Sequence, residues 1–208
     1  MILYWALWVI LRAYFRGVLR VRVEGLQHLP RRGGAVLCSN HFSWVDPLLL
    51  GAALPRHLFY MTKAEAFASP AASAVLRSVG AFPVHRHRAD RRAIRQALGL
   101  LGAGRVVAVF PEGTRSRDGQ LGPAQPGAAL VALWSGKCVV PVAICGRYSP
   151  GRLTVRIGKP FELRLPGDRK PSPADLQMVA EEQIMGAVRN LLREAPPSRG
   201  QRVAVGRA

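Results

Sequence analysis

The chain of 208 residues has about the size of one domain, and its hydrophobic fraction of 49% is ordinary for a globular protein. Thirty Lys and Arg against twelve Asp and Glu give a formal net charge of +18, which favours an anionic partner such as nucleic acid, an anionic membrane surface or a phosphorylated substrate. The three cysteines, Cys38, Cys138 and Cys145, form no C-x-x-C or other metal-type spacing, which argues against disulfides and against a zinc site.

The first 20 residues predict a helix that lies in a membrane interface. Residues 1–11 are apolar and include two tryptophans and a tyrosine, and Arg12, Arg16 and Arg20 follow. The apolar run is shorter than the roughly 20 residues that a membrane-spanning helix needs. It also lacks the preceding basic residue and the following cleavage site of a secretory signal. Aromatic residues beside arginines are typical of the headgroup region. The alternative is an N-terminal helix that packs on the protein's own core.

Short strands alternate with helices along the rest of the chain, which predicts one α/β domain with a mixed, mostly parallel sheet flanked by helices. Strands are expected over residues 20–24, 35–39, 58–62, 81–84, 105–110, 138–144 and 153–157, the sixth interrupted by Pro141. Helices are expected over residues 48–54, 69–78, 89–101, 127–135 and 172–194. The run 105–110 is almost continuously apolar, as in a strand that is buried on both faces. Pro83 keeps the strand 81–84 out of a fully paired central position.

The stretch NHFSWVD at residues 40–46 follows the expected strand 35–39 and places a histidine and a carboxylate five residues apart. Positions five apart on one helix point in different directions, so His41 and Asp46 can face each other only across a loop. Because Pro47 follows, Asp46 is also a good helix N-cap. Either Asp46 orients the ring of His41 as a general base, or Asp46 only caps a helix and His41 is a loop residue.

A second polar stretch, FPEGTRSR at residues 110–117, follows the expected buried strand. Loops at the ends of strands in α/β sheets commonly carry functional residues. Arg115 could grip a phosphate through two hydrogen bonds. Glu112 could accept a hydrogen bond from a hydroxyl or orient an arginine. The alternative is a solvated turn with a local ion pair, so this stretch alone is weakly informative.

Taken together, the two stretches resemble the glycerolipid acyltransferase family. The first carries an HX4D motif, His41 to Asp46, and the second reads Phe-Pro-Glu-Gly-Thr-Arg-Ser from residue 110. Two further blocks match in order, GAFPVHR at residues 80–86 and VVPVAI at residues 139–144. The resemblance runs from about residue 21 to residue 160. It is closest to the 1-acylglycerol-3-phosphate acyltransferases, which convert lysophosphatidic acid to phosphatidic acid.

The resemblance implies an enzyme of phospholipid biosynthesis on the cytoplasmic face of the cell membrane. His41 would take the proton of the acceptor hydroxyl and Asp46 would orient His41. The alkoxide would then attack the thioester of acyl-CoA or acyl carrier protein, without a covalent acyl-enzyme. The lysophospholipid acceptor would be bound by Lys63, Arg86, Glu112, Gly113, Thr114 and Arg115. No metal or other cofactor is implied.

The chain would divide into a membrane-interface helix (1–20), an acyltransferase domain (21–195) and a basic disordered tail (196–208).

Two departures from the family pattern bear on the acceptor. His85 stands where the family often has an acidic residue, and Ala124-Gln125-Pro126 stands where it often has a lysine before the helix at 127–135. The nearest alternative is therefore a related acyltransferase that acts on glycerol 3-phosphate, another lysophospholipid or an amino-lipid. A hydrolase that uses water as the acceptor is a further alternative.

The alternative outside enzymes is a basic nucleic-acid-binding module. Such a module needs aromatic side chains among its basic residues, on which bases can stack. The aromatic residues of this chain instead cluster at the N-terminus and in residues 40–46. This arrangement disfavours nucleic acid as a partner.

Overall fold

The computed structural model describes residues 2–85, 90–116, 120–165 and 171–194. Its strands are β1 (Arg22–Glu24), β2 (Ala35–Ser39), β3 (Leu58–Lys63), β4 (Ala81–Val84), β5 (Val106–Val109), β6 (Val139–Gly146) and β7 (Leu153–Ile157). Its helices are α1 (Ile2–Ala13), α2 (Asp46–Ala53), α3 (Pro70–Ser78), α4 (Arg91–Gly102), α5 (Gly127–Ser135), α6 (Pro173–Val179) and α7 (Gly186–Arg193). Short 3-10 helices lie at Leu26–His28 and Ala64–Phe67, and π-helical segments at Tyr14–Val18 and Ala180–Met185.

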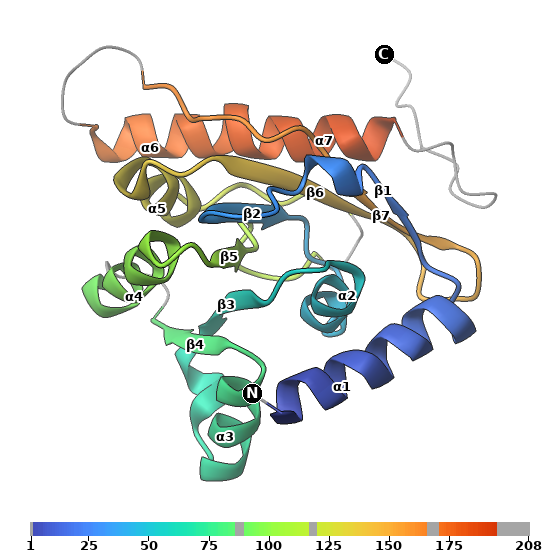
Figure 1. The fold of residues 1–208 in the computed structure, drawn as a ribbon. Helices are drawn as coiled ribbons and strands as arrows, with labels where there is room; N and C mark the ends of the chain where they lie inside the picture. Colours follow the sequence, from blue (N-terminus) through green and yellow to red (C-terminus); the bar gives the residue numbers. More distant parts are fainter. Residues whose placement is uncertain (1, 86–89, 117–119, 166–170, 195–208) are drawn as a thin grey trace.

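The strands form one sheet with helices on both faces (Figure 1). The strand order is β1-β7-β6-β2-β5-β3-β4. Neighbouring strands are parallel except for β6 and β7, which form an antiparallel hairpin. The expected mixed, mostly parallel sheet is therefore confirmed. The strand with Pro83, β4, lies at the edge of the sheet, as its proline predicts.

Local capping explains where several helices begin. The Ser69 hydroxyl accepts a hydrogen bond from the backbone N–H of Ala72 at the start of α3. Ser172 and Asp175 form a reciprocal capping box at the start of α6. A proline follows each serine at the first helical position, where its missing N–H costs nothing. The two starts agree with those predicted from the sequence. From Ser172 the helical run continues through α6, the π-helical segment and α7, as one rod in Figure 1.

The core has two layers, one on each face of the sheet. Successive side chains of a strand point to opposite faces, so Leu37 of β2 joins the layer under α2, while Val36 and Cys38 join the layer under α4 and α5. All five residues of β2 are buried. This central position explains why the loop that follows β2 is held in a defined place.

One expectation about the strands is wrong: Pro141 does not interrupt β6, which runs from Val139 to Gly146. The carbonyl of Pro141 accepts from Gly158 N at 2.8 Å, on the side of β6 that faces β7. In a strand the nitrogen of a residue points to the same side as its carbonyl. The nitrogen of Pro141 therefore faces β7, so its missing N–H removes no bond to β2, and β7 has already ended at Ile157.

The N-terminal segment packs on the core with one side and is exposed on the other. Arg12 donates from Nη1 to the Ala52 carbonyl at the end of α2, at 3.2 Å, and Phe15 is buried. Val9, Ile10, Tyr14 and Val18 are exposed. Among the helices of the described residues, none is long and apolar enough to cross a membrane. The expected disordered tail, 196–208, lies outside the residues that the structure describes.

Candidate active site

The two sequence stretches meet at the end of the sheet where the carboxyl ends of its parallel strands lie. Strands β2 and β5 are parallel neighbours, so the loops that follow their carboxyl ends lie side by side. The backbone N–H of Ser116 donates to the His41 carbonyl at 2.8 Å, and the backbone N–H of His41 donates to Oε1 of Glu112 at 2.9 Å. Residues some 70 positions apart in the sequence are therefore held together by direct hydrogen bonds.

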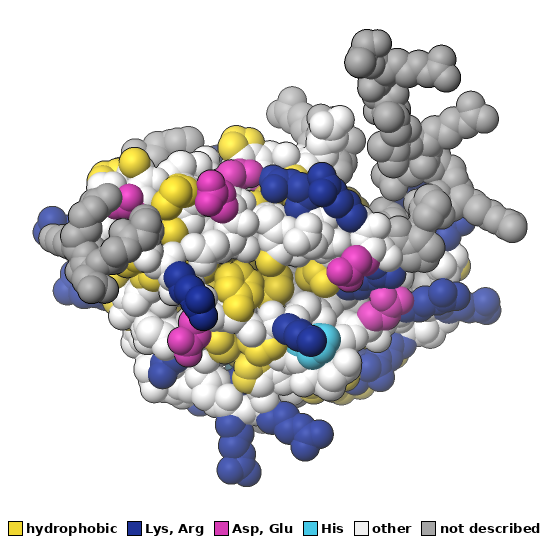
Figure 2. All heavy atoms as spheres, turned by 90° about the horizontal axis from the view of Figure 1, so that it is seen from above, with side chains coloured by type: hydrophobic (Ala, Val, Ile, Leu, Met, Phe, Trp, Pro, Cys, Tyr) yellow, Lys and Arg dark blue, Asp and Glu magenta, His cyan; other side chains and the backbone are white. Residues whose placement is uncertain are grey.

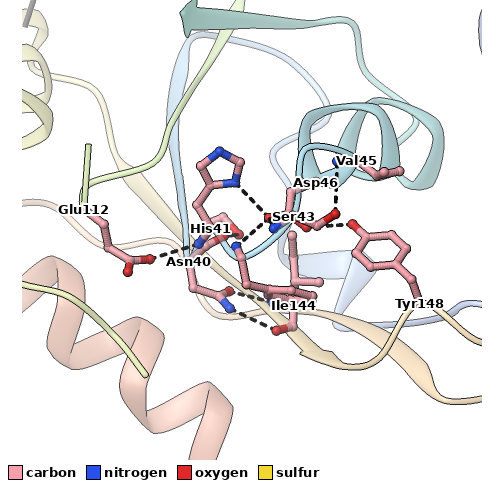
Figure 3. Close-up of polar contacts among 10 residues, drawn as sticks. Asn40, His41, Ser43, Val45, Asp46, Glu112, Ile144 and Tyr148 are labelled. Atoms are coloured by element: carbon pink, nitrogen blue, oxygen red, sulfur yellow. Dashed lines mark hydrogen bonds and ion pairs between the residues drawn. The ribbon is translucent and has the colours of Figure 1, made fainter. Parts of the chain in front are cut away.

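His41 and Asp46 face each other across a loop (Figure 3). The ring atom Nδ1 of His41 lies 2.8 Å from Oδ2 of Asp46, whose side chain is fully buried. The backbone N–H groups of Phe42 and Ser43 also donate to Oδ2, at 2.7 and 2.8 Å. Asp46 therefore turns back toward the loop and makes no capping bond to α2, whose N-cap is Val45. The expected N-cap role of Asp46 is wrong, because the loop and the ring take its carboxylate.

The geometry around His41 favours one tautomer of its ring. Only a protonated Nδ1 can donate to the carboxylate of Asp46, which leaves Nε2 as the atom that can accept a proton. The Phe110 ring stacks on the imidazole, with 4.1 Å between ring centroids and 23° between the planes. The His41 side chain remains 14% exposed, so a substrate can reach it.

Asn40 anchors the start of this loop to the neighbouring strand. Its side chain donates from Nδ2 to the Ile144 carbonyl at 3.0 Å and accepts from Ile144 N at 2.8 Å (Figure 3). The buried amide thus makes the two hydrogen bonds to β6 that the backbone of a further β2 residue would make, just past the end of the β2–β6 pairing. The position of His41 follows directly, because it is the next residue in the chain.

Glu112 faces the backbone and not the solvent. Its Oε1 accepts from His41 N and its Oε2 accepts from Gly122 N, each at 2.9 Å. Burial raises the pKa of Glu112, and the hydrogen bonds from these two amides oppose that shift. The local ion pair that the sequence suggested is replaced by these amide contacts. The side chain expected to bind substrate thus also supports the His41 backbone.

Three of the remaining expected binding residues, Lys63, Thr114 and Arg115, are exposed. Gly113 has a φ of +67°, a left-handed conformation that favours glycine, and it turns the chain so that Thr114 and Arg115 reach the surface. Lys63 is exposed at the carboxyl end of β3, at the same edge of the sheet as His41. Arg86 lies outside the described residues.

Arg115 stacks on an aromatic ring within the HX4D loop. Its guanidinium carbon lies 3.9 Å from the centroid of the Trp44 ring, and Trp44 is 76% exposed. A guanidinium that is stacked by its face keeps its in-plane N–H groups free for an anion. Sequence reasoning missed this contact, since nothing in the spacing pairs residue 44 with residue 115.

A second contact that sequence reasoning missed lies on the far side of Asp46. The hydroxyl of Tyr148, from the loop between β6 and β7, donates to Oδ1 of Asp46 at 2.6 Å (Figure 3). Tyr148 lies 102 residues from Asp46 in the chain, and no motif marks it. Only the adjacency of β6 and β2 in the sheet brings the two together.

The assembled groups suit one kind of chemistry. An imidazole held in one tautomer can remove a proton from a hydroxyl, and an exposed arginine beside it can hold an anionic group of the same molecule. Within the described ranges, no group of three His, Cys, Asp or Glu residues could hold a metal ion.

Comparison with known sequences gives consistent matches. A family model described as Acyltransferase matches residues 20–145, which include both loops. A 1-acyl-sn-glycerol-3-phosphate acyltransferase of Bacillus subtilis is 32% identical over 148 residues, covering 68% of this chain and 73% of that protein. A lyso-ornithine lipid O-acyltransferase of Pseudomonas aeruginosa is 38% identical over 128 residues, covering 61% of this chain and 48% of that protein. Several other curated relatives are longer, and the chain spans 36% to 51% of their length.

The fold also has a counterpart among solved structures. The crystal structure of the 1-acyl-sn-glycerophosphate (LPA) acyltransferase PlsC from Thermotoga maritima matches with a TM-score of 0.64. The match covers 91% of this chain and 81% of the other chain, at 24% sequence identity. At this identity the likeness concerns the fold.

Proposed function

The chain belongs to the acyltransferase family that includes the 1-acyl-sn-glycerol-3-phosphate O-acyltransferases, and from this premise we propose that it converts lysophosphatidic acid to phosphatidic acid. The acyl donor would be acyl-CoA or acyl carrier protein. The observation that carries the proposal is the hydrogen bond of 2.8 Å between His41 Nδ1 and the buried Asp46, beside the exposed Arg115. A base and an anion-binding group thus lie at one edge of the sheet, as an acceptor with both a hydroxyl and a phosphate requires.

In the proposed reaction His41 acts as general base. Nε2 takes the proton of the acceptor hydroxyl as its oxygen attacks the carbonyl carbon of the thioester. The new C–O bond forms, the C–S bond breaks, and the leaving thiolate receives the proton from the imidazolium. Asp46 stabilises the positive charge that His41 carries between these two proton transfers. No covalent acyl-enzyme is needed.

We propose that Arg115 binds the phosphate of the acceptor. An ammonium cannot match the two parallel hydrogen bonds that a guanidinium makes, nor its stacking on Trp44. Arg115→Lys is therefore expected to raise KM for lysophosphatidic acid about tenfold, since a charge-assisted hydrogen bond contributes about 1.5–3 kcal/mol. KM for the thioester donor should stay nearly constant. The measurement is steady-state kinetics in which each substrate is varied in turn.

The matched control is Arg77→Lys. Arg77 also lies over an aromatic ring, that of Phe67. It stands on the last turn of α3, which leads to the amino end of β4, whereas His41 follows the carboxyl end of β2. Its replacement should change neither KM. If Arg115→Lys weakens donor binding and leaves the acceptor untouched, then Arg115 holds the phosphates of the donor and the proposed pocket is wrong.

A second acceptor class has support of its own. The relative from Pseudomonas aeruginosa carries the name of a lyso-ornithine lipid acyltransferase, and residues 124–126 hold no lysine before α5. A matrix of donors and acceptors, read by mass spectrometry of the lipid product, separates the two functions. We expect phosphatidic acid from lysophosphatidic acid. Turnover with lyso-ornithine lipid alone would overturn the proposed acceptor, and release of free fatty acid alone would indicate a hydrolase.

We also propose that the N-terminal segment binds an anionic membrane surface, on the cytoplasmic face of the cell membrane. Residues 8–23 hold four arginines and no acidic residue, and the apolar side chains of Val9, Ile10, Tyr14 and Val18 are exposed among them. By contrast, the face that α6 and α7 cover carries acidic side chains among its basic ones (Figure 2). Exposed apolar side chains flanked by arginines favour binding to an anionic lipid surface.

The membrane contact predicts a loss of liposome binding when a charge is placed on this side of α1. Ile10→Glu is expected to lower binding to anionic liposomes about tenfold, because it removes apolar burial and adds repulsion. A substitution is preferable to deletion of the helix, since Leu11 and Phe15 pack against the core. The control is Trp134→Glu on α5, where the side chain is similarly exposed, at 56% against 65% for Ile10. Equal flotation of Ile10→Glu and the unmodified protein would place the membrane contact elsewhere.

A further inference from the structure

The carboxylate of Asp46 is held from two sides. On one side Oδ2 receives the ring of His41 and the backbone N–H groups of Phe42 and Ser43. On the other side Oδ1 receives the Tyr148 hydroxyl at 2.6 Å, a short distance typical of a hydrogen bond from a neutral O–H to a carboxylate. Because Asp46 is fully buried, no solvent can replace a donor that is lost.

The loop that carries Tyr148 is itself well held. Arg147 N donates to the Arg152 carbonyl at 2.9 Å, which closes the turn between β6 and β7. Gly146 has a φ of +97°, and a side chain there would overlap the Arg152 carbonyl oxygen. Gly151 N donates to the Leu19 carbonyl at 2.8 Å, which ties the turn to the N-terminal segment. These hydrogen bonds fix the turn between β6 and β7, and the turn in turn fixes the position of the Tyr148 hydroxyl.

The ring of Tyr148 also has a defined place. It packs against Phe42, with 5.7 Å between ring centroids. Burial, the negative charge of Asp46 and the hydrogen bond to it together raise the pKa of Tyr148 well above its ordinary value. The hydroxyl thus keeps its proton and stays a donor to the carboxylate throughout the pH range of an assay.

We propose that Tyr148 is a positioning residue for acyl transfer: its hydroxyl holds the Asp46 carboxylate so that Oδ2 stays on the Nδ1–H of His41. The hydroxyl does not reach the substrate and acts through Asp46. With it removed, the carboxylate keeps its backbone donors on Oδ2 but loses the charge-assisted bond on Oδ1, which loosens the carboxylate and weakens the orientation of the imidazole. The inference rests on the proposed role of His41 as general base, and it holds for any acceptor hydroxyl.

The test is a double-mutant cycle on turnover. Tyr148→Phe keeps the ring and removes only the hydroxyl, and we expect kcat to fall about tenfold while KM for donor and acceptor changes less than about twofold. In the Asp46→Asn background the same substitution should have little further effect, because the carboxylate that the hydroxyl positions is gone. The control is Tyr60→Phe, which removes a hydroxyl that donates to the Pro47 carbonyl at 2.8 Å, beside Asp46 but not to its carboxylate.

Each outcome of the cycle either supports or overturns the positioning role of Tyr148. Additive losses in the double variant, or an equal loss of kcat in Tyr60→Phe, would overturn the proposal. A Tyr148→Phe protein that no longer melts cooperatively would also overturn it, since the hydroxyl would then serve the fold alone. The cycle is run with whichever acceptor the unmodified protein acylates. A failure to make phosphatidic acid therefore corrects the substrate without deciding on Tyr148.

Discussion

His41→Ala is expected to lower kcat about a thousandfold or more, the largest effect of any single substitution in this protein. General-base catalysis contributes about 10²- to 10⁴-fold, and no other imidazole in the described residues bonds to Asp46. Substrate binding should be retained, because the exposed Arg115 and the N-terminal segment are untouched. The measurement is the rate of formation of acylated product at saturating donor and acceptor, with liposome flotation as the test of membrane binding.

A second histidine supplies the control. His28 donates from Nδ1 to the Ile157 carbonyl, 2.8 Å away, and Ile157 ends β7, two places from β2 in the sheet. His28→Ala should affect stability more than turnover. Turnover of a folded His41→Ala protein at the rate of the unmodified enzyme would exclude His41 as the base.

Asp46→Asn is expected to cause the next largest loss, about a hundredfold in kcat, smaller than that of His41→Ala. Two backbone N–H groups, those of Phe42 and Ser43, donate to Oδ2. They select the amide oxygen of asparagine for the same position, so the His41 ring keeps an acceptor for its Nδ1–H and its useful tautomer. What is lost is the negative charge that stabilises the imidazolium.

Two further variants isolate this effect. Asp46→Ala removes the acceptor as well as the charge, and should lose more activity than Asp46→Asn. Asp90→Asn changes a carboxylate that accepts from the backbone of Arg92 and Ala93 at the start of α4, and it should leave kcat unchanged. An Asp46→Asn protein as inactive as His41→Ala would indicate that the asparagine had turned its amide group toward the ring, against the two backbone donors.

Much of the architecture could be predicted from local signals. Ser69-Pro70 and Ser172-Pro173 marked two helix starts, and alternation or continuous apolar runs marked the strands. These signals act within a few residues, so the sequence carries them directly. The predicted interruption at Pro141 was wrong because the effect of a proline depends on which neighbouring strand its nitrogen faces and on where that strand, here β7, ends. Both are properties of the sheet.

The sequence by itself determined which functional groups are present: a histidine and a carboxylate five residues apart after one strand, and an arginine-bearing loop after another. It also determined that the N-terminus is apolar and arginine-rich. Only the tertiary structure decided how these groups are held. The parallel pairing of β2 with β5 and β6 brings Glu112 under the His41 amide, Asn40 against Ile144, and Tyr148 onto Asp46. The physical reason is that a buried carboxylate or amide must find its hydrogen-bond partners among whatever groups the sheet places beside it, and those groups come from distant parts of the chain.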